Sequence, residues 1–144
     1  MNWFYLVLCF IGGIGLSFQA SVNSELGRKI GTIEVSCLAY TVGAIILFIM
    51  ACFFGKGNML EALNFPKWKL FVGIFGALFI YIIILSVPKI GIASAIIAGI
   101  VGQMFLSMII DHYGLFGNIQ TPINVSRILG LALMFLSTYL FYTK

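Results

Sequence analysis

Five long apolar runs, separated by short polar segments, make up most of the chain. The runs lie at about residues 3–22, 33–54, 68–87, 91–110 and 125–142. Each comes close to the roughly 20 apolar residues that an α-helix needs to cross a hydrocarbon layer roughly 30 Å thick. The pattern therefore predicts an all-α integral membrane protein with five transmembrane helices, in one transmembrane domain over residues 1–144.

The polar segments predict the connections between these helices. Residues 23–29 and 88–90 are expected to be short turns, and residues 55–67 and 111–124 are long enough to form loops. Trp68, flanked by Lys67 and Lys69, is typical of a span that begins at the level of the lipid headgroups.

Composition excludes the other classes of protein. Of the 144 residues, 62% are hydrophobic and 8% are charged, whereas a soluble domain is about 25% charged. So few charges could not cover a surface that faces water. The eight basic residues stand singly or in pairs at the ends of apolar runs. The net charge of +4 therefore predicts contact with membrane lipid and not with nucleic acid.

Basic residues are shared equally between the two sides of the membrane that five spans define. The side of the N-terminus holds Lys56, Lys67, Lys69 and Arg127, and the other side holds Arg28, Lys29, Lys89 and Lys144. An excess of Lys and Arg normally orients a membrane protein, and here there is none. Either the first helix or a partner sets the orientation, or the chain inserts both ways. In the second case it would pair with an inverted copy of itself, as an antiparallel dimer of ten helices.

Two expected helices carry a stripe of small and polar residues at a spacing of four. In the first helix the stripe is Gly15, Gln19 and Asn23. In the fourth it is Gly91, Ala95, Gly99, Gln103, Ser107 and Asp111. Small residues let helices approach closely, and amides form hydrogen bonds across such contacts. We interpret Gly91, Ala95, Gly99 and the adjacent Gly102 as helix-packing positions.

The polar members of the stripes are the candidate functional residues. An amide that faces lipid would stay unpaired at a cost of a few kcal/mol, so each stripe should face protein or a water-filled path. Gln19, Asn23, Gln103 and Ser107 either join helices or line a substrate path, and both roles are compatible. Asp111 is the best charged contributor to such a path.

Acidic residues avoid the middle of every span. Glu25, Glu34, Glu61 and Asp111 all lie at span ends or in loops, so an embedded acid that could exchange a proton for a cation is not obvious. Asp111 and Glu34 are the nearest candidates; otherwise each is a cap or an ion-pair partner. Arg127 is placed to snorkel or to pair with Asp111. His112 is expected either to relay protons or to form hydrogen bonds in the loop.

Sequence motifs of enzymes are missing from this chain, and its three cysteines have no metal-ligand spacing. We therefore expect no catalytic residues, no bound metal and no cofactor.

Several motifs together resemble the YdcZ-like inner-membrane family, which is grouped with the drug/metabolite transporter superfamily. They are 102–107 with 111–117, Gln19 with Asn23, 87–91, and 127–130. The resemblance covers essentially the whole chain. It implies a multi-pass protein of the bacterial inner membrane that works as an antiparallel pair, in some members as a dual-topology homodimer. It supplies no substrate. The small multidrug transporters of related architecture carry a glutamate in the first helix, where this chain has Gln19, which weighs against proton-driven export of organic cations.

These observations lead to a main functional hypothesis and two alternatives. The main one is a small secondary transporter or exporter of a polar or amphipathic small molecule, which works by alternating access as an inverted homodimer. The first alternative is an uncoupled channel or facilitator on the same scaffold. The second is a membrane assembly subunit that transports nothing.

Overall fold

The computed structural model describes residues 3–64, 66–117 and 119–143. Over these residues all regular secondary structure is helical, and five helices are long and apolar enough to cross a membrane, as predicted. They are α1 (Trp3–Ile30), α2 (Thr32–Phe54), α4 (Gly73–Ile90) with the short α3 (Lys67–Leu70) leading into it, α5 (Ile92–Tyr113) and α6 (Val125–Tyr142). Two short 3-10 helices, η1 (Met59–Asn64) and η2 (Leu115–Gly117), lie in the connections.

The first helix is longer than the sequence pattern predicts. Residues 23–29, expected to be a polar turn, form the last turns of α1. Lys29 Nζ lies 2.7 Å from Glu25 Oε1, and pairs at this spacing stabilise a helix. Arg28 and Lys29 also place positive charge at the C-terminal end of the helix dipole. The polar composition of this segment therefore belongs to a helix end and not to a turn.

A single glycine makes each of the two tightest connections. Gly31 joins α1 to α2 with φ 108° and ψ 143°, and Gly91 joins α4 to α5 with φ 81° and ψ 160°. This backbone region is almost restricted to glycine. The third span also continues past its expected end, through Pro88 to Ile90. One residue is enough to end one helix and begin the next because glycine adopts a conformation that other residues avoid.

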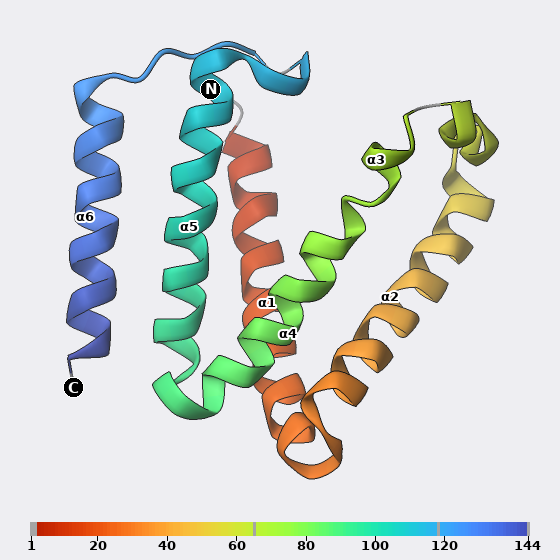
Figure 1. Ribbon diagram of the computed structural model, residues 1–144, viewed down its shortest axis with the longest axis horizontal. Coiled ribbons are helices and arrows are strands. Elements are labelled where there is room, and N and C mark those ends of the chain that lie inside the picture. The colour runs from red at the N-terminus through yellow and green to blue at the C-terminus, as the bar shows by residue number, and fades with distance from the viewer. Residues whose placement is uncertain (1–2, 65, 118, 144) are drawn as a thin grey trace. The chain divides into compact units, whose positions relative to one another are not determined.

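The chain divides into two compact units, residues 1–88 and 89–144. In the first unit α1 and α2 pack together and diverge from their connection like the arms of a V (Figure 1). In the second unit α5 and α6 pack antiparallel. Ser94 Oγ donates a 3.2 Å hydrogen bond to the Phe141 carbonyl, which joins the start of α5 to the end of α6.

Gly27 marks the place where α4 approaches α1. A Cβ added to Gly27 would lie 2.7 Å from Ile84 Cγ2, and the Ile84 side chain is 1% exposed. That separation is shorter than van der Waals contact, and Cγ2 is a branch methyl with little freedom to move. Glycine at this position therefore permits the approach of the two helices.

Replacing Gly27 with alanine is expected to destabilise the protein by about 1–3 kcal/mol, because the methyl group overpacks the contact with Ile84. Thermal or SDS unfolding in detergent micelles would measure the loss. Leucine at position 84 lacks the branch methyl at a similar volume, so adding Ile84→Leu should recover much of the stability. Equal stability of Gly27→Ala and the parent protein would contradict the contact.

Candidate functional site

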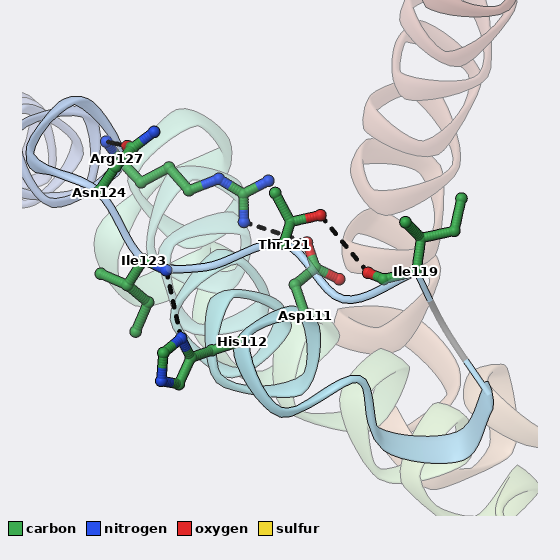
Figure 2. Close-up of polar contacts among 7 residues, drawn as sticks. All are labelled: Asp111, His112, Ile119, Thr121, Ile123, Asn124 and Arg127. Carbon is green, nitrogen blue, oxygen red and sulfur yellow. Dashed lines mark hydrogen bonds and ion pairs between the residues drawn. The ribbon is translucent and has the colours of Figure 1, made fainter.

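A group of polar contacts joins the end of α5 to the start of α6 (Figure 2). Arg127 Nη1 lies 3.3 Å from Asp111 Oδ2, and the two side chains are 34% and 39% exposed. The predicted pairing of Arg127 with Asp111 is therefore confirmed. Asn124 begins α6 by accepting a 2.9 Å hydrogen bond from the Arg127 backbone N–H at its Oδ1, which is a typical N-cap.

The loop between α5 and α6 is held by hydrogen bonds to the last turn of α5. The Ile123 N–H donates to His112 Nδ1 at 3.2 Å, and Gln120 Nε2 donates to the His112 carbonyl at 3.1 Å. The Thr121 N–H donates to the Asp111 carbonyl at 2.8 Å. His112 is thus a loop-ordering residue, one of the two roles predicted for it. Its Nδ1 accepts a hydrogen bond, so the neutral ring carries its proton on Nε2.

The Asp111–Arg127 pair is expected to contribute about 0.5–1 kcal/mol to stability, the range of partly exposed pairs. A double-mutant cycle of Asp111→Asn, Arg127→Gln and the double variant, measured by unfolding in micelles, would give this coupling. Both substitutions leave the Asn124 cap in place. If the effects of the two single substitutions simply add, the pair contributes nothing and the prediction is wrong.

The middle of the stripe on α5, at Gln103, faces away from α6, whereas Asp111 at its end pairs with Arg127 of α6. Ser94 contacts α6, and Gln103 follows it by nine residues, which is two and a half helical turns. The two side chains therefore point to opposite sides of α5. Gln103 and Ser107 are exposed, while Asp111 at the end of the stripe is half-buried beside Arg127. Within its own unit, the amide of Gln103 is thus left without a covering helix.

On α1 the two polar residues of the stripe differ in their exposure. Gln19 is exposed, whereas Asn23, one turn further along, is 7% exposed. Asn23 Nδ2 is buried without a hydrogen-bond partner among the described residues. A substrate-lining role for Gln19, Asn23, Gln103 and Ser107 stays a prediction.

The small residues predicted to pack helices have varied surroundings. Ala95 is 4% exposed and Gly99 is half-buried, whereas a Cβ added to Gly102 would meet no described atom within 4 Å. Gly91 has open space around it too, and it forms the connection before α5. The face of α5 at Gly102 is therefore free to receive another helix.

The roles of two glycines could not be predicted from the sequence pattern. Gly27 and Gly31 form a GxxxG spacing that reads as a poor dimerisation motif; in the structure Gly27 receives Ile84 and Gly31 reverses the chain. Lys-Ile-Gly occurs at both 29–31 and 89–91, and both glycines have positive φ. This repeated tripeptide was the signal that could have located the two connections.

Comparison with known proteins agrees with this architecture. The family described as "Putative inner membrane exporter, YdcZ" matches residues 4–140 of the chain. "Inner membrane protein YdcZ" of Escherichia coli (strain K12) is 24% identical over 115 residues, which cover 75% of this chain and 76% of that protein. No solved structure matches the chain significantly.

The fold and the comparisons together define a class of protein. It is a multi-pass inner membrane protein, and the exporter description of its relatives implies a transporter and not an enzyme. The family match extends over almost the whole length of the chain. The chain therefore belongs to the YdcZ family, and the Escherichia coli protein is a distant relative of it.

Proposed function

We propose that this protein is a small secondary exporter of a polar or amphipathic molecule, and that it works by alternating access as an antiparallel homodimer. Two inverted copies would provide ten helices and a pathway near the middle of the membrane, as in inverted-repeat transporters. The single observation that carries the proposal is the amide of Gln103, which is exposed on the side of α5 opposite α6.

The exposure of side chains on the helices indicates a protein partner or a water-filled pathway only where the exposed side chain is polar. Between 0% and 17% of the residues in the apolar window of each candidate span are buried. Lipid covers apolar side chains as well as protein does, so this exposure alone requires no partner. The amides of Gln19 and Gln103 differ, because lipid offers them no hydrogen bonds. Protein or water in a pathway would meet that need.

The equal distribution of basic residues supports the antiparallel arrangement. Gly31 and Gly91 lie on the same side of the membrane if all five helices cross it, and Arg28, Lys29 and Lys89 flank them there. Lys56, Lys67, Lys69 and Arg127 fall on the other side, so no excess of charge selects one orientation. Lys144 follows α6 and lies outside the described residues.

Flux measurements on purified protein in liposomes test the proposal. A panel of labelled cations, anions and neutral metabolites should show one class that moves faster than in protein-free liposomes, with uptake driven by an ion gradient. Flux that continues unchanged when an ionophore removes every gradient would indicate a facilitator. If no solute moves faster than in protein-free liposomes, the remaining alternative is a membrane assembly subunit that transports nothing.

A further inference from the structure

The carboxamide of Asn23 is buried while its hydrogen-bond donors are unused. Asn23 is 7% exposed, and its Nδ2 has no partner among the described residues. Ser94, also 7% exposed, shows the usual outcome, because its hydroxyl donates to the Phe141 carbonyl. A buried polar group without a partner destabilises a protein, and such groups in native folds call for a specific explanation.

The position of Asn23 gives it no structural task of its own. It lies inside α1, two turns before the helix ends at Ile30, so its side chain is not required as a cap. One turn further along the same face, Gly27 receives Ile84 of α4. An apolar side chain would suit a place beside this contact better than an amide does. Asparagine at this position therefore destabilises the fold as long as its donors have no partner.

The unpaired Nδ2 atom of Asn23 determines which kind of chemical group this side chain can bind. The NH2 group of an amide has two donors and no acceptor, so it binds an oxygen or another acceptor and cannot bind a cation directly. The neighbouring carboxylate on α1, Glu25, is exposed and paired with Lys29. An anion would lose its hydration beside Asn23 without gaining a counter-charge, which favours an uncharged oxygen.

We propose that Asn23 Nδ2 is the donor that binds a neutral, partly apolar substrate through its carbonyl or hydroxyl oxygen. Because the amide is buried, a substrate reaches it only if the groups packed around Asn23 move apart, so the structure corresponds to a closed conformation. The inference rests on the proposed transport function and names its substrate class. It makes the exporter one of neutral molecules that carry an acceptor, and not of organic cations.

Three probes that share a phenyl ring test this selectivity: benzamide, benzoate and benzyltrimethylammonium. Ligand-induced thermal shifts of the full-length protein in detergent would give the affinity of each. Benzamide should bind more tightly than the other two. Asn23→Leu should bind benzamide about tenfold more weakly, the loss of one hydrogen bond, and its melting temperature without ligand should equal or exceed that of the parent.

Ser17→Leu is the matched control. Ser17 lies on the same helix, and its hydroxyl already donates to the Gly13 carbonyl, so this variant should keep the parent's affinity for benzamide. The inference is overturned if Asn23→Leu melts at a lower temperature, if it binds benzamide as the parent does, if benzyltrimethylammonium binds best, or if no probe binds. Because these assays measure binding, a protein that binds benzamide through Asn23 without any flux in liposomes would refute only the proposed transport.

Discussion

Removing two basic residues from one side of the membrane is expected to bias strongly towards one orientation the mixed population that we propose for the parent protein. Lys56→Gln with Lys67→Gln leaves that side with two basic residues against four, and Arg28→Gln with Lys89→Gln produces the opposite bias. Because Lys and Arg in short loops are retained in the cytoplasm, each pair should shift the ratio of orientations by about tenfold or more, in opposite directions.

Labelling a single cysteine measures these orientations. Gly57 lies in the connection after α2 with open space around it, so Gly57→Cys can be introduced after Cys9, Cys37 and Cys52 are replaced by alanine. A membrane-impermeant maleimide should reach about half of the parent molecules from each side, the ratio expected without a charge bias. Lys56→Arg with Lys67→Arg keeps the charge and should keep this ratio.

The same variants test whether the inverted pair is the active form. Each biased variant alone should lose flux, because only one orientation is present, and co-expression of the two should restore it. Labelling of the parent from one side only would refute dual topology. Full flux from one biased variant alone would refute the antiparallel pair.

Replacing Gln103 with leucine is expected to reduce flux at least about tenfold while the proposed dimer persists. The amide lies on the uncovered side of α5, where it would contact the substrate path, and leucine removes its donors and acceptor at similar size. Flux in liposomes and chemical crosslinking, measured on the same preparation, would separate transport from assembly.

Met104 provides the control for this prediction. It follows Gln103 directly on α5 and is 49% exposed, but it carries no hydrogen-bonding amide. Met104→Leu should retain both flux and crosslinking. If Gln103→Leu transports normally, Gln103 has no role in the path; if it loses the crosslinked dimer, the amide joins helices instead.

The five spans could be predicted from the sequence because hydrocarbon imposes a single rule over a long window of residues. An apolar run of the right length must form a helix, since the membrane offers no other partner for backbone groups. The pairing of Asp111 with Arg127 could also be anticipated, because opposite charges at the facing ends of consecutive helices lie close together.

Local conformation was harder to predict, because the same residues suit more than one structure. Asn23–Lys29 has the composition of a turn, yet its 2.7 Å ion pair and the placement of its positive charges suit the end of a helix. The reversal of the chain falls instead on Gly31, where φ is 108°. Only the backbone distinguishes a glycine that reverses the chain from one, such as Gly27, that receives a neighbouring side chain.

The sequence by itself determined the membrane environment, the number of candidate membrane spans and the equal number of basic residues on the two sides that five spans define, because each follows from composition along the chain. The tertiary structure decided which polar groups already have partners. Gln19 and Asn23 look alike in the sequence, one turn apart on one face. Only packing shows that Gln19 is exposed and that the Asn23 donor is buried and unpaired. Whether a polar group has a hydrogen-bond partner depends on atoms that folding brings together from distant parts of the chain. The spacing of polar residues along the sequence does not show which atoms these are.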